Sequence, residues 1–225
     1  MSEFCDKVVK KPWGYEYLMY ESDKIAIWYL HISHGRQTSL HCHPCKKTGY
    51  ILLDGEAQVS FLNGHVQLRA LSKLMLREGL FHSTRAISPD GIHVIEVESP
   101  PNKEDLVRLD DIYGRKEQPY EGEECRVPMT DSCITISEPG LGRADSYEIC
   151  STSLTVEKFA DASELLKRPH DEIILVMQGG LYTKNNDPIL SPGDVVTIAT
   201  LARLAGTFHS PDGITTMTVR KGEDV

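Results

Sequence analysis

Hydrophobic and polar residues alternate in short runs along most of the chain, a pattern typical of β-strands with one buried face. It is visible in "DKIAIWYLHIS", in "GIHVIEVE" and in "YILLDGEAQVSFL", where two β-rich runs flank a turn. Asn63-Gly64 follows the last of these and is a strong hairpin signal. Only 104–114 and 161–168 have patterns that suggest short helices or turns. Many short strands separated by turns predict an all-β sandwich or barrel.

Two blocks of the first half are repeated in the second half. "ISPDGIHVIEV" (87–97) matches "HSPDGITTMTV" (209–219), and "TGYILLDGEA" (48–57) resembles "DEIILVMQGGL" (171–181). The offsets between the aligned glycines are nearly equal, at 122 and 124 residues. A repeat of this length predicts that a whole small β domain has been duplicated.

The segment 116–146 between the repeated blocks is rich in Gly, Pro and acidic residues. We interpret it as a linker with connecting strands, so the expected domains are 1–115 and 147–225. Because small β domains must protect their sheet edges, we expect a homodimer.

The composition narrows the functional classes. The hydrophobic and charged fractions, 40% and 25%, are those of an ordinary soluble protein. A net charge of −9 argues against a nucleic-acid surface, and no apolar run approaches the ~20 residues that cross a bilayer. The start of the chain has no apolar core of a secretory signal, so we expect a cytoplasmic protein with six reduced cysteines and no membrane partner.

The stretch "GRQTSLHCHPCKKTGYILLDG" (35–55) carries the candidate chemistry. On a strand, His41 and His43 point to the same face, about 7 Å apart at their Cα atoms, and can converge on one metal ion. Cys42 points to the opposite face. Cys45 follows a proline at which the strand can bend, but a single CxxC is neither a four-thiolate zinc site nor, without a βαβ pattern, a typical redox motif.

Five positions of this stretch resemble the first motif of the cupin superfamily, G(x)5HxH(x)3-4E(x)6G, at every spacing: Gly35, His41, His43, Thr48 and Gly55. The departure is Thr48, where the family has a metal-binding Glu. In "LSKLMLREGLFHSTRA", Gly79 and His82 resemble the second cupin motif. The resemblance implies double-stranded β-helix (jelly-roll) barrels in tandem, a bicupin, with His82 as a third ligand beside His41 and His43.

Three neutral imidazoles without a carboxylate leave a divalent ion its double positive charge, which favours an anionic, chelating substrate. Zinc is the expected ion, with Fe, Mn, Co or Ni as alternatives. The histidines could instead be packing groups of a barrel without metal. In the second half, Leu165, Lys167 and Leu204 replace the histidines and Glu172 keeps the acid, so the resemblance implies a degenerate cupin that holds no metal.

"KKPWGYEYLMY" and "VESPPNKEDLVRLDDIYGR" resemble, over about 1–115, the cupin domain of type II mannose-6-phosphate isomerases. The resemblance implies a metal that polarises the oxygens of an open-chain sugar, and a binding or catalytic role for Arg108. Tyr50 is a second catalytic candidate because it shares the inward face with Thr48. The alternatives are an ion pair of Arg108 with Asp105, Asp110 or Asp111, and a packing role for Tyr50.

We therefore expect a metal-dependent enzyme that moves a proton next to the carbonyl of a phosphorylated sugar. A three-His iron dioxygenase of a small anionic substrate is the second hypothesis. The third is a non-catalytic sugar-binding or regulatory cupin. Metal content distinguishes them, since iron favours the dioxygenase and the absence of metal favours the binding protein.

Overall fold

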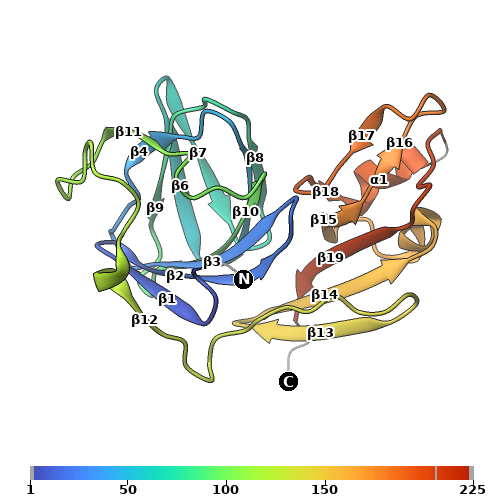
Figure 1. Cartoon of the computed structure of the whole chain (residues 1–225), viewed down its shortest axis with the longest axis horizontal. Helices are drawn as coiled ribbons and strands as arrows, with labels where there is room; N and C mark the ends of the chain where they lie inside the picture. The colour runs from blue at the N-terminus through green and yellow to red at the C-terminus, as the bar shows by residue number, and fades with distance from the viewer. Residues whose placement is uncertain (1–2, 206, 223–225) are drawn as a thin grey trace. The chain divides into compact units, whose positions relative to one another are not determined.

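The computed structural model describes residues 3–205 and 207–222. Its chain forms two compact units, Met1–Thr135 and Ile136–Val225. Both are built from antiparallel sheets, which confirms the predicted all-β, jelly-roll class (Figure 1). None of the helices in the described part of the chain is long and apolar enough to span a membrane.

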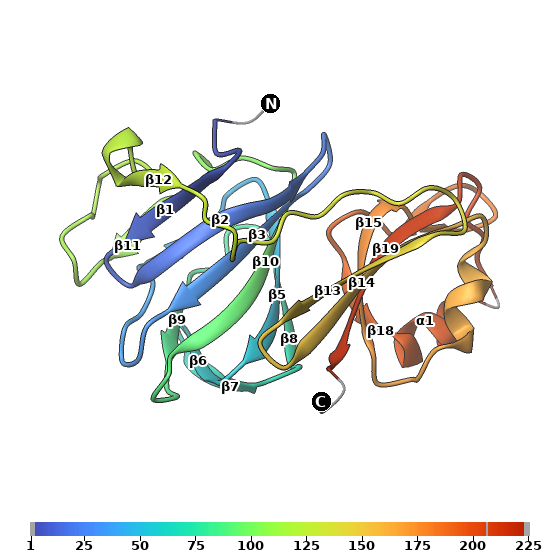
Figure 2. The ribbon, with the colours of Figure 1, turned by 90° about the horizontal axis from the view of Figure 1, so that it is seen from below.

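One wall of the first unit is a seven-stranded sheet in which every neighbouring pair is antiparallel. Figure 2 shows its long central strands side by side. In spatial order the strands are β12 (Arg126–Pro128), β1 (Lys7–Lys11), β2 (Gly14–Glu21), β3 (Ala26–Ile32), β10 (Ile92–Ser99), β5 (Lys47–Asp54) and β8 (Lys73–Leu76).

The second wall of this unit is a five-stranded sheet that carries the histidine motif. Its order is β11 (Val107–Asp110), β4 (Leu40–Cys42), β9 (His82–Ala86), β6 (Glu56–Phe61) and β7 (Gly64–Arg69). The predicted hairpin is confirmed: β6 and β7 pair from Phe61 opposite Gly64, so a two-residue turn joins them. The expectation of a helix or turn over 104–114 is wrong in part, because the alternating residues of β11 pair with β4 instead.

The core of the first unit lies between the two walls. Inward positions alternate along each strand, as in β3, where Trp28, Leu30 and Ile32 are all buried in one apolar cluster. Each such side chain contributes about 1.5–3 kcal/mol through burial. Further along β10 the same inward face changes from Ile92 and Val94 to two glutamates, so the core is apolar at one end and polar at the other.

A glycine is required where β5 turns into β6. Gly55 has φ +87°, and a Cβ there would lie 2.7 Å from the carbonyl oxygen of Gly91. This close approach explains the last glycine of the first motif as a requirement of the turn rather than of the chemistry.

The second unit has a five-stranded sheet, a two-stranded sheet and two short helical segments. The larger sheet is β13 (Ala144–Ile149), β14 (Thr152–Phe159), β19 (Ile214–Lys221), β15 (Ile173–Gly179) and β18 (Val195–Thr197); the smaller is β16 (Leu181–Tyr182) and β17 (Pro188–Leu190). A 3-10 helix covers Ala162–Lys167, within the predicted segment 161–168. The α-helix α1 (Ile198–Ala205) was not predicted from the sequence; Ile198 and Leu201 place one of its faces in the core.

The repeated blocks occupy corresponding strands. In the first unit β10 lies between β3 and β5, and in the second β19 lies between β14 and β15. Gly55 and Gly179, which end the aligned strands, both have positive φ. The sequence repeat therefore corresponds to a repeat of strand order.

Candidate metal centre

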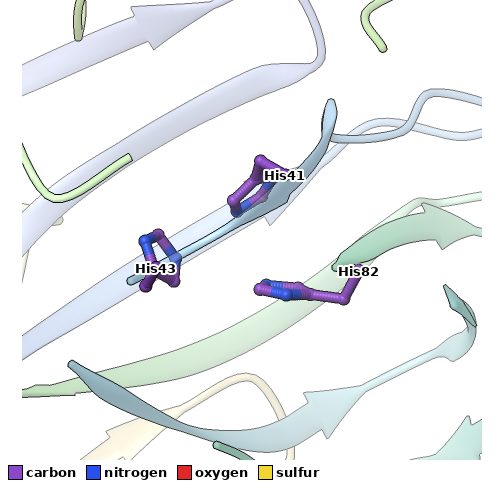
Figure 3. A group of neighbouring side chains, drawn as sticks. All are labelled: His41, His43 and His82. Atoms are coloured by element: carbon purple, nitrogen blue, oxygen red, sulfur yellow. The ribbon is translucent and has the colours of Figure 1, made fainter. Parts of the chain in front are cut away.

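Three histidines from two adjacent strands of the first unit lie together. His41 is in β4, His43 follows its end, and His82 begins β9 directly opposite His41. One ring nitrogen of each lies within 4.8 Å of the other two. Figure 3 shows the rings around a common space. Their centroids are 4.5–5.6 Å apart. The structure thus brings together the three residues expected as ligands.

Backbone carbonyls fix the orientation of all three rings. Nδ1 of each histidine lies at hydrogen-bond distance from a carbonyl oxygen: 2.8 Å for His41 to Ser39, 2.6 Å for His43 to Asp105 and 2.9 Å for His82 to Leu80. A carbonyl only accepts, so Nδ1 carries the proton and Nε2 keeps its lone pair.

The free Nε2 atoms test whether these residues fit a cation. Nε2 of His43 and of His82 is buried and has no hydrogen-bond partner among the described residues. Leaving a buried polar atom unpaired costs about 1–3 kcal/mol. A divalent ion bound by the three Nε2 atoms would remove that cost, and an Nδ1–H bonded to a carbonyl is the usual second partner of a metal-bound imidazole. The donor set therefore fits a transition metal such as zinc.

Electrostatics keeps the three rings neutral, as ligands must be. Burial is the main cause, and it lowers the pKa of His43 to about 2 and that of His82 to about 4. The pKa of His41 is also well below its usual range, because of burial and the neighbouring histidines. All three imidazoles are available for coordination at neutral pH.

No carboxylate joins the histidine cluster within the described chain. Thr48, at the position of the family's Glu, is buried with its hydroxyl oxygen unpartnered. Glu98 lies opposite it on β10, but its Oε1 is 2.9 Å from both Lys46 and Lys103. The carboxylate nearest to this position therefore belongs to the neighbouring strand, and it is paired with two lysines.

Arg108 lies in β11 directly opposite His41. Its Nη1 donates to the backbone carbonyls of Gln118 (2.5 Å) and Pro119 (2.9 Å), and its Nη2 is 3.9 Å from Glu121. The alternative expectation was an ion pair with Asp105, Asp110 or Asp111. The Arg108 guanidinium instead contacts residues 118–121. The charge of Arg108 is also one cause of the low pKa of His41.

Tyr50 is buried and its ring centroid is 5.9 Å from that of His82. Burial, with the nearby Glu96 as a further cause, raises the pKa of its phenol well above the usual value. Tyr50 therefore stays protonated, so it can donate a hydrogen bond but cannot act as a base.

A cavity that is partly open to solvent lies beside the histidines. Besides His41, His43 and Tyr50 it is lined by five basic and four acidic side chains: Lys11, Lys46, Lys103, Arg108, Arg115, Glu16, Glu96, Glu98 and Glu121. Of these charged residues, only Arg108 was named as a site candidate from the sequence.

Two of these residues, Glu96 and Glu98, could have been found from the sequence. They follow Ile92 and Val94 at every second position of β10, so the strand alternation places both acids on the inward face. The others come from β1, β2, the loop between β4 and β5, and the loops before and after β11. Only the fold brings these segments together.

No family model and no curated protein matches the chain. Among solved structures it is similar to KdgF from Halomonas sp. (16% identity, 45% of this chain and 94% of that one, TM-score 0.41). A protein with a double-stranded β-helix domain from Klebsiella pneumoniae (17%, 49% and 90%, 0.40) and a cupin-2 domain protein from Shewanella frigidimarina (16%, 38% and 79%, 0.34) are also similar. This similarity concerns the fold and does not extend to substrate or activity.

Proposed function

We propose that the first unit is a metal-dependent cupin enzyme that moves a proton next to the carbonyl of a phosphorylated sugar. His41, His43 and His82 would hold the metal. The observation that carries the proposal is that the buried Nε2 atoms of His43 and His82 have no hydrogen-bond partner among the described residues, beside a charged cavity that His41 and His43 line. When bound, the metal would act as a Lewis acid on the oxygens of the substrate.

The charge of the cavity supports an anionic substrate. Five basic side chains face four carboxyls there, and three neutral ligands would leave the metal's double charge uncompensated. A phosphate or another anion would supply the missing negative charge. The resemblance of 1–115 to the cupin domain of type II mannose-6-phosphate isomerases supports a sugar phosphate as that anion.

Tyr50 and three apolar side chains of the cavity suit proton transfer next to a carbonyl. Tyr50 stays protonated and can donate to a substrate oxygen that gains negative charge. Trp13, Leu30 and Leu106 add apolar walls that limit access of water.

The experiment separates three steps. Protein purified without chelator is analysed for metal, its affinity for mannose 6-phosphate is measured by calorimetry, and deuterium incorporation at C2 of that sugar is followed in D2O. Zinc, manganese or cobalt with exchange at C2 supports the proposal. Iron with oxygen uptake on addition of a thiol or diketone would favour the dioxygenase, and sugar binding without metal would favour the binding protein.

A further inference from the structure

Resting on the proposed function, we infer that Glu96 is the catalytic base that takes the proton from the substrate carbon and returns it to the neighbouring one. Glu96 is on the inward face of β10, between Trp28 of β3 and Tyr50 of β5. It lines the same cavity as His41 and His43 and is buried. It is neither one of the three histidines nor within two residues of them.

Glu96 differs from the other carboxylates of the cavity in having no assigned partner. Glu98 is bound by Lys46 and Lys103, and Glu121 by Lys11 and Arg115. Glu16 accepts from Tyr120 and is paired with Lys103. Within the described chain, the carboxyl of Glu96 takes part in no hydrogen bond or ion pair. It alone is available to a substrate without breaking an existing contact.

The groups around Glu96 tune it for reversible proton transfer. Burial raises its pKa to about 7. Glu98 on the same strand and Glu16 on β2 oppose its ionisation, while Lys103 and Lys46 favour it. Tyr50 faces it from β5 and remains protonated. A base with a pKa near the working pH can both accept and return a proton efficiently.

The proposed step is balanced without an oxidant or reductant. The carboxylate of Glu96 takes the proton of the C2–H bond of an open-chain aldose phosphate. The electron pair of that bond forms a C1–C2 double bond, and the π pair of the C1 carbonyl moves to the aldehyde oxygen. The carbonyl is then re-formed at C2, and the proton on Glu96 is delivered to C1. The aldehyde oxygen gains one proton and the C2 hydroxyl loses one, so the product is the ketose and Glu96 is again ionised.

The test compares the metal-loaded wild type with Glu96→Gln, Glu96→Asp and a surface control, Glu56→Gln. Glu56 is more than half exposed, and its one ion pair among the described residues is with the exposed Arg69. For each protein, metal content, affinity for mannose 6-phosphate, the melting temperature and deuterium exchange at C2 are measured. The infrared band of the protonated carboxyl is followed against pH.

We expect Glu96→Gln to keep its metal and its affinity and to lose about 10²–10⁴-fold in exchange rate. A carboxyl band that titrates near pH 7 in the wild type should be missing from that variant. Glu96→Asp should fold, retain partial exchange and shift the pH profile, which covers the case in which the Gln variant does not fold. Glu56→Gln should match the wild type.

Three results would overturn the inference, and they are distinguishable. If Glu96→Gln exchanges as fast as the wild type, the base is elsewhere while the proposed function stands. If Glu96→Gln folds but loses its metal, Glu96 supports the structure of the site and is not a base. If the wild type binds metal and sugar phosphate without any exchange, the proposed function itself is wrong and the role of Glu96 falls with it.

Discussion

Replacing His82 by Leu should abolish metal-linked stabilisation without destabilising the metal-free protein. The perturbation removes a buried imidazole whose Nδ1 bonds the carbonyl of Leu80 and whose Nε2 has no partner. Leucine fills much of the same space without introducing a polar atom. The two contributions of the imidazole to metal-free stability therefore act in opposite directions.

The magnitudes can be worked from these contacts. Loss of the hydrogen bond to Leu80 costs about 1 kcal/mol, whereas removal of an orphaned buried nitrogen gains about 1–3 kcal/mol. The metal-free variant should therefore range from equal in stability to about 2 kcal/mol more stable. In the wild type, a metal at 100 times its dissociation constant adds about 2.7 kcal/mol, and the variant with two ligands should lose nearly all of this.

The assay is urea unfolding of both proteins, with chelator and with zinc. A metal-free variant that is destabilised by several kcal/mol would show that His82 is a packing residue. Equal stabilisation of both proteins by zinc would show that the ion binds elsewhere. Cys45→Ser is the matched control, because Cys45 is exposed and lies outside the histidine cluster; it should keep the full zinc effect.

Three further predictions concern the framework of the site. Burial opposes the ionisation of Glu16, but two lysines outweigh it and lower its pKa from 4.5 to about 2. The ionised carboxylate therefore contributes up to about 3 kcal/mol of stability, which should be lost as the pH falls from 4.5 towards 2. In urea unfolding, Glu16→Gln should lose less stability than the wild type over this pH range. Arg108→Lys should cost about 1.5–3 kcal/mol through its two carbonyl contacts and speed amide hydrogen exchange in 118–121. Gly55→Ala should destabilise more than Gly114→Ala in thermal unfolding, since both have positive φ but a Cβ at Gly114 meets nothing within 4 Å.

The sequence predicted the fold class and the pairing of two histidines for simple physical reasons. Strand alternation alone places His41 and His43 on one face, and the turn chemistry of Asn63-Gly64 indicates the hairpin. His82, which is separated from His43 by the four strands β5 to β8, could be added only through the resemblance to the second cupin motif. Its position opposite His41 results from the pairing of β4 with β9.

The remaining parts of the site depend on long-range packing that no local pattern encodes. Lys103 lies over the ring of Trp28 from a loop 75 residues later in the chain. The helix α1 was missed because "VVTIAT" has the β-branched composition of a strand, and only the packing of its later turn against the core makes it helical. β11 was missed for the opposite reason: it is an edge strand with exposed apolar residues, Val107 and Leu109, that resemble a short amphipathic segment.

Main-chain atoms hold all three imidazoles at their Nδ1 positions. A side-chain substitution cannot remove a backbone carbonyl. Replacing Ser39, Leu80 or Asp105 should therefore leave the orientation of each ring unchanged, as long as the local backbone conformation is kept. Mutational tolerance around the cluster should therefore be wide, and the flanking side chains are free to diverge between descendants of this protein. Selection on coordination would then be concentrated on just three codons.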